Sequence, residues 1–112
     1  MIAQSNVHYR KGTDQVYDRV GYETNGYRIV VFNGKYGIAD KDLNETVSPK
    51  YDKIEEYGIE NEKGLWVVEL NGLHGVITTL GQEILPCKFK YINKGNDIRV
   101  YTKNIVNNSR LL

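Results

Sequence analysis

The feature that most constrains this chain is an internal duplication. Shifting the 112-residue sequence along itself by 38 residues, with no gap, places Asn33-Gly34 on Asn71-Gly72. A period of about 20 to 50 residues is typical of proteins in which each copy is one structural unit. We therefore predict a single domain over 1–112 that holds two full repeats, about 26–63 and 64–101, with partial copies at both ends. The same shift also pairs identical or similar residues elsewhere: Gly37 with Gly75, Glu45 with Glu83, Lys50 with Lys88, Ile54 with Ile92, Ile29 with Val67 and Tyr51 with Phe89.

Each repeat reads as short strands joined by tight turns. The β-branched and aromatic run 28–32 ends at Asn33-Gly34, a dipeptide that suits a two-residue turn with positive φ at both positions. After the return strand, 35–39, the Asp and Asn residues of 40–44 predict a second turn. Pro49 has no backbone N–H, so it either ends the next strand or confines that strand to a position where no neighbouring strand needs a hydrogen bond from residue 49. The strands expected in order are 28–32, 35–39, 46–48 and 51–57 in the first copy, then 65–70, 73–78, 83–85 and 88–92 in the second.

Composition agrees with an all-β fold. Alanine, the best helix former, occurs only at positions 3 and 39, whereas the chain holds nine Tyr and eleven Gly. Because sequential antiparallel strands usually pair with their neighbours, we expect a meander that forms either a sandwich-like stack or a partly closed barrel. Gly37 and Gly75 fall inside predicted strands, where glycine marks a bulge or the close approach of another backbone or ring.

Residues 33–40, with the sequence Asn-Gly-Lys-Tyr-Gly-Ile-Ala-Asp, resemble the WG repeat, a β-rich repeat of many bacterial proteins. The segments 50–52 and 81–86 fit the Lys-Tyr-Asp and Pro-terminated strand of that family. The chain departs from the family pattern where Tyr36 and His74 replace the Trp, and where Leu43 stands in place of the usual turn glycine. The resemblance covers roughly residues 17–104. It implies a scaffold or protein-binding module with no shared active site.

The sequence contains few residues of the types that act as nucleophiles or bind metal ions. The sequence has one cysteine, Cys87, and two histidines, His8 and His74, and no pattern supplies the third group of a nucleophilic triad or a metal-ligand cluster. Cys87 is then a packed residue with no chemical role, one half of an intermolecular disulfide, or a reactive thiol, and we favour the first of these. Both Asn-Gly dipeptides lead into strands, whereas phosphate-binding loops open helices. We predict that the protein is not an enzyme and uses no cofactor or metal.

The first residues carry no long apolar run behind a basic start, so we expect neither a signal peptide nor a membrane span. The predicted location is the cytoplasm, without membrane association.

Charge is balanced overall, at +1, but not along the chain. Residues 40–85 contain ten Asp or Glu and four Lys, which gives −6, whereas residues 86–112 contain six Lys or Arg and one Asp, which gives +5. Alternation along 88–92 would place two lysines on one face, and Phe89 and Tyr91 on the other, toward the core. We call the predicted binding residues of this region the basic stripe: Lys88, Lys90, Tyr91, Lys94, Arg99, Tyr101 and Lys103.

Three interpretations of these charges remain open. The charges form ordinary solvated faces, a surface that docks a protein, or a groove for single-stranded RNA or DNA. The −6 segment disfavours nucleic acid because it would repel phosphates. We predict a non-catalytic protein-binding module, acting as a small inhibitor of a larger protein such as a toxin or a bacterial defence nuclease, with nucleic-acid binding as the alternative. Strands at the sheet edges also offer a route to a homodimer.

Overall fold

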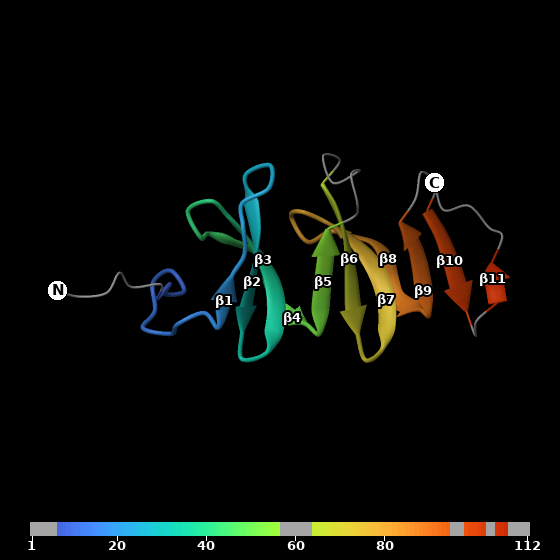
Figure 1. Cartoon of the computed structure of the whole chain (residues 1–112), viewed down its shortest axis with the longest axis horizontal. Helices are drawn as coiled ribbons and strands as arrows, with labels where there is room; N and C mark the ends of the chain where they lie inside the picture. The colour runs from blue at the N-terminus through green and yellow to red at the C-terminus, as the bar shows by residue number, and fades with distance from the viewer. Residues whose placement is uncertain (1–6, 57–63, 95–97, 103–104, 108–112) are drawn as a thin grey trace. The chain divides into compact units, whose positions relative to one another are not determined.

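The structure is a computed structural model that describes residues 7–56, 64–94, 98–102 and 105–107 (Figure 1). All regular elements in these residues are strands, which confirms the predicted all-β antiparallel meander. The chain groups into two compact units, 1–50 and 51–112. Over the described residues, no helix has the length and apolarity that crossing a membrane requires.

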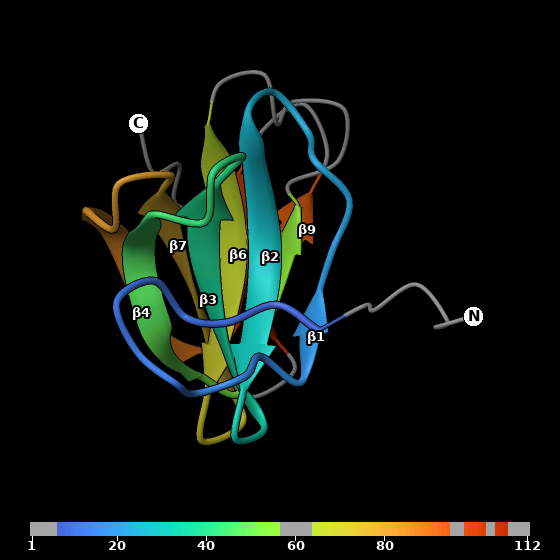
Figure 2. The same cartoon turned by 90° about the vertical axis from the view of Figure 1, so that its left-hand side faces the viewer.

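The first unit is built on one antiparallel sheet in the order β1-β2-β3-β4. Its central hairpin aligns Ile29 with Ile38 and Phe32 with Lys35. Figure 2 shows the N-terminal segment running across the face of β2, β3 and β4. The strands are β1 (Arg19–Val20), β2 (Tyr27–Phe32), β3 (Lys35–Asp40) and β4 (Glu45–Tyr51), the last of which ends on the first residue of the second unit.

The second unit contains two antiparallel sheets, in the orders β5-β6-β7-β8 and β11-β10-β9. The hairpin of β6 and β7 aligns Val67 with Val76, the pair that lies 38 residues beyond Ile29 and Ile38. Every pair of this hairpin repeats the register of β2 and β3 at the same offset, so the duplication is structural. The strands are β5 (Lys53–Glu56), β6 (Leu65–Leu70), β7 (Leu73–Thr78), β8 (Glu83–Phe89), β9 (Tyr91–Lys94), β10 (Ile98–Thr102) and β11 (Ile105–Asn107).

Both predicted Asn-Gly turns are present. Asn33 and Gly34 have φ values of 52° and 77°, and Asn71 and Gly72 have 56° and 82°. Positive φ at both central residues matches the right-handed twist of the flanking strands. A third such turn, at 25–26, lies before β2 and was not predicted, because no strand pattern precedes it.

The strand around Pro49 corrects one prediction. We expected a strand at 46–48 and a separate strand at 51–57, whereas β4 continues through Pro49 to Tyr51, and β5 covers only Lys53–Glu56. β4 is the last strand of its sheet, so the missing N–H of Pro49 does not break an interior ladder. Of the two possibilities left open for Pro49, the edge position is the correct one.

The close approach predicted at the two strand glycines is confirmed. A Cβ on Gly37 would lie 2.4 Å from the carbonyl oxygen of Val47, and one on Gly75 would lie 2.5 Å from that of Leu85. The partner strand therefore crosses directly over each glycine. Opposite Gly75, the β7–β8 register shifts between His74 and Val76.

Each unit has its own apolar cluster. In the first unit, Val20, Phe32 and Leu43 pack around a buried center of Tyr17, Val30 and Ala39. In the second, Leu65, Phe89 and Ile92 pack around Val67, Val76 and Leu85.

Candidate functional site

The described part of the basic stripe begins at the junction of β8 and β9. Lys88 and Lys90 are exposed, and Tyr91 is 54% exposed. This corrects the expectation that the Tyr91 ring faces the core. The chain bends at Lys90, so strict alternation fails there, and Phe89 and Ile92 pack on the apolar cluster instead.

The backbone brings further stripe positions onto the neighbouring strand. β9 pairs with β10, with Tyr91 opposite Tyr101 and Asn93 opposite Arg99. Lys94 ends β9. Lys103 lies outside the described residues. Four of the seven predicted positions therefore lie on β9 and β10, while Lys88 lies near the end of β8 and Lys90 lies at the bend between β8 and β9.

The candidate nucleophile is poorly suited to reaction. The Cys87 thiol is half-buried, and burial, followed by the nearby carboxylates of Glu83, Asp52 and Glu69, raises its pKa. A raised pKa leaves less thiolate at neutral pH, and the thiolate is the reactive form.

His74 takes part in a cross-strand contact. Its Nε2 lies 3.5 Å from Oε1 of Glu69, its partner on β6. Its buried Nδ1 has no hydrogen-bond partner among the described residues. Searching the described part of the chain shows no group of three or more His, Cys, Asp or Glu side chains placed to hold a metal ion.

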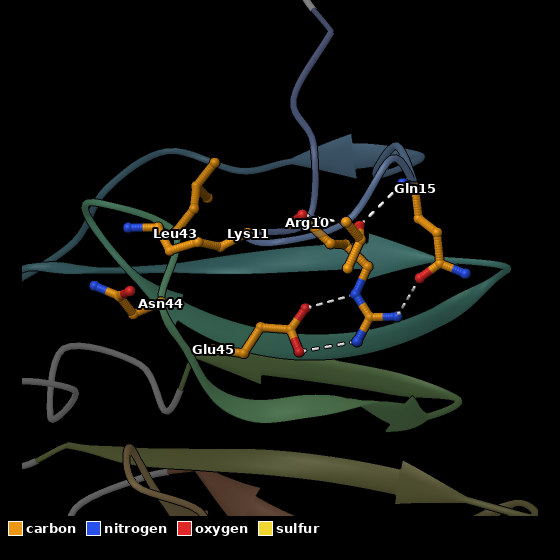
Figure 3. Close-up of a pocket in the computed structure, with 7 residues that line it drawn as sticks. Arg10, Lys11, Gln15, Leu43, Asn44 and Glu45 are labelled. Atoms are coloured by element: carbon orange, nitrogen blue, oxygen red, sulfur yellow. Dashed lines mark hydrogen bonds and ion pairs between the residues drawn. The ribbon is translucent and has the colours of Figure 1, made fainter.

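Sequence reasoning missed a polar cluster in the first unit. Arg10 donates from Nε to Oε2 of Glu45 at 2.9 Å and from Nη2 to Oε1 at 3.0 Å (Figure 3). The hydroxyl of Tyr17 also donates to Oε2 of Glu45. The Arg10 guanidinium also lies 4.6 Å from the Phe32 ring centroid. These contacts fasten the N-terminal segment to β4 and β2.

Local backbone bonds position Arg10. The Arg10 N–H donates to the carbonyl of Gln15 at 2.8 Å, and Tyr9 forms an isolated bridge with Val16. The resulting small hairpin borders a pocket of about 430 Å³. The pocket is lined by Arg10, Lys11, Thr13, Gln15, Leu43, Asn44 and Glu45.

The electrostatics of this cluster favour the ion pair. Burial alone would raise the pKa of Glu45, but the hydrogen bonds from Arg10 and Tyr17 outweigh it and lower that pKa. Burial, then the hydrogen bond to Glu45, raises the pKa of Tyr17. All three groups hold their usual protonation states at neutral pH, so the cluster tethers the N-terminal segment through an ion pair and a hydrogen bond to Glu45. No local pattern could have revealed it, because Arg10 and Glu45 are 35 residues apart.

The duplicated meander defines a β-repeat protein. Residues 36–73 match the family model described as a WG containing repeat, the family that the sequence resemblance predicted. The matched segment begins in β3 and ends at the first residue of β7, so it spans one full period. No curated protein and no solved structure matches the chain.

Proposed function

We propose that this chain is a cytoplasmic, non-catalytic protein-binding module that docks its partner on the basic stripe. The observation that carries the proposal is the exposed ring of Tyr91 beside exposed Lys88 and Lys90. Large aromatic side chains supply much of the binding energy at interfaces, and surrounding charges steer the partner and fix its register. A partner with an acidic surface around an apolar pocket fits this arrangement.

The proposed partner is a larger protein that the module inhibits, such as a toxin or a bacterial defence nuclease. Covering a functional surface requires no chemistry of the inhibitor itself, and a protonated Cys87 supplies little. The fold class does not define the partner, so this part of the proposal depends on its test.

The test is capture of partners by the triple variant Lys88→Glu, Lys90→Glu, Arg99→Glu. We expect partner affinity to fall about tenfold or more, because charge reversal introduces repulsion at the interface. The matched control is Lys41→Glu, Lys50→Glu, Lys53→Glu, which changes the net charge equally but leaves the stripe intact. Equal capture by the wild type and the stripe variant, when circular dichroism shows that both proteins are folded, would contradict the proposal.

The same proteins should be titrated with a fluorescein-labelled single-stranded RNA. We expect no saturable binding at physiological salt. Saturable binding that weakens steeply with salt and disappears in the stripe variant would replace the protein-binding proposal by the nucleic-acid alternative. Sedimentation equilibrium of the wild type tests the predicted homodimer.

A further inference from the structure

The two repeats differ at one equivalent position in a way that suggests a ligand site. The 38-residue shift places Arg28 on Trp66. Trp66 is 1% exposed, and its Nε1 donates to Oγ1 of Thr79 at 2.9 Å. Arg28 is half-buried, and its Nε is buried with no hydrogen-bond partner. The second repeat fills this position with a satisfied apolar ring, whereas the first leaves a cationic donor unsatisfied.

The backbone beside Arg28 differs in the same place. In the second unit, β5 continues along β6 until Glu56 lies opposite Trp66. In the first unit, the β1 ladder stops where Val20 lies opposite Val30. Gly21 still donates to the carbonyl of Ile29, at 2.8 Å, and pairing resumes only where Thr24 bridges Tyr27. The intervening Tyr22 and Glu23 bulge away from β2.

This bulge borders a pocket of about 590 Å³. Arg19 also lines it, but its Nη2 already lies 3.3 Å from the Tyr36 hydroxyl, and its guanidinium lies near the Tyr36 ring. Arg28 is therefore the better candidate to receive an anion. Tyr22, at the same pocket, is 97% exposed, which is unusual for a ring of its size. The pocket is lined by Arg19, Val20, Gly21, Tyr22, Glu23 and Arg28.

We propose that this pocket binds a single carboxylate side chain of an extended peptide segment, with Arg28 as its ion-pair partner and Tyr22 packing on the peptide. A planar guanidinium matches the two oxygens of a carboxylate, so a carboxylate in this pocket would form an ion pair with Arg28. Glu23 in the same lining disfavours a dianion such as phosphate, because a second negative charge would meet like charge. This pocket belongs to the first unit and shares no residue with the basic stripe.

The test uses the full chain, labelled with ¹⁵N, and an acetylated, amidated hexapeptide with one glutamate among five serines as the probe. We expect a saturable shift of the Arg28 Nε resonance. Arg28→Gln and Tyr22→Ala should each weaken binding about tenfold, the size expected when one charge-assisted contact or one packed ring is lost. The matched control is Lys53→Gln, at an exposed β5 position, which should bind as the wild type does.

Three outcomes would overturn this proposal. They are unchanged binding by folded Arg28→Gln and Tyr22→Ala, equal occupancy by inorganic phosphate at the same concentration, and loss of binding in the stripe variant instead. The last outcome would assign the peptide to the basic stripe, so failure here is distinguishable from failure of the proposed function. Because Arg28 is partly buried, Tyr22→Ala keeps the test valid if Arg28→Gln fails to fold.

Discussion

At the scale of single residues, the glycine of each repeat signature is fixed by a neighbouring backbone. Carbonyl oxygens of Val47 and Leu85 occupy the space that a Cβ on Gly37 or Gly75 would need. Backbone atoms cannot rotate away as a side chain can, so the partner strand itself would have to move. The requirement is steric, because neither glycine has a positive φ.

We predict that Gly75→Ala lowers the free energy of unfolding by about 3 kcal/mol, the upper range for overpacking a dense interior. Urea denaturation followed by Trp66 fluorescence measures this change. Ser48→Ala, at an exposed position of β4, is the control and should change stability by less than about 0.5 kcal/mol. A decrease in the free energy of unfolding below about 1 kcal/mol for Gly75→Ala would show that β8 can shift at little cost to make room for the added methyl group.

Glu45 makes stability depend on pH. Because its pKa in the folded protein lies below the ordinary value, the folded state binds a proton less readily than the unfolded chain. The stabilisation is therefore complete above the unfolded pKa and is lost as pH falls through the folded pKa. We expect Glu45→Gln to be less stable than the wild type at neutral pH, with the difference shrinking toward pH 3.

The measurement is urea midpoints from about pH 7 to pH 3, the range in which glutamates titrate. Glu83→Gln changes the equivalent glutamate of the second repeat, which is exposed, and serves as the control. A constant difference between Glu45→Gln and the wild type across this range would contradict the role assigned to the ion pair.

At the scale of elements, an aspartate before each repeat holds the following hairpin turn. Oδ2 of Asp18 accepts from the backbone N–H of Gly34 at 2.9 Å, and Oδ2 of Asp52 accepts from the N–H of Asn71 at 2.8 Å. Each aspartate directly follows a buried tyrosine, Tyr17 or Tyr51. In the first unit, the Tyr17-Asp18 pair thus joins the apolar cluster to the hairpin turn.

We predict that Asp18→Ala destabilises the protein by about 1.5 kcal/mol, the low end for a hydrogen bond to a charged group. Hydrogen exchange of the Gly34 amide should become faster, while exchange in the β6–β7 hairpin stays unchanged. Asp18→Asn retains an acceptor oxygen and should recover part of the protection. Unchanged Gly34 exchange in Asp18→Ala would show that this bond does not hold the turn.

At the scale of the whole molecule, charge is segregated along the sequence although the total is near zero. The acidic segment 40–85 and the basic segment 86–112 carry −6 and +5. A protein with such separation presents local fields much stronger than its net charge suggests.

We predict that the wild type is retained on a cation exchanger at pH 7 despite a formal charge of +1. The stripe variant, with Lys88, Lys90 and Arg99 changed to Glu, should elute at lower salt than the control variant, with Lys41, Lys50 and Lys53 changed to Glu. The two variants have the same net charge. Equal elution of the two variants would show that the basic residues do not act as one surface.

Local patterns determined much of this protein. The duplication, the β-branched runs and the Asn-Gly dipeptides specified strands and turns, because turn geometry and strand propensity act over a few residues. The same patterns identified Gly37 and Gly75 as sites of close approach. They also led to the WG repeat, which the family match at 36–73 confirms.

Tertiary structure decided the rest, because those features depend on contacts between distant residues or on small departures from regularity. The Arg10–Glu45 tether joins positions 35 residues apart, and no periodicity marks it. The bend at Lys90 turned Tyr91 outward because Phe89 and Ile92 both pack on one cluster. The pocket beside Arg28 exists because the edge strand of the first sheet ends two residues earlier than its counterpart, which only the strand register reveals.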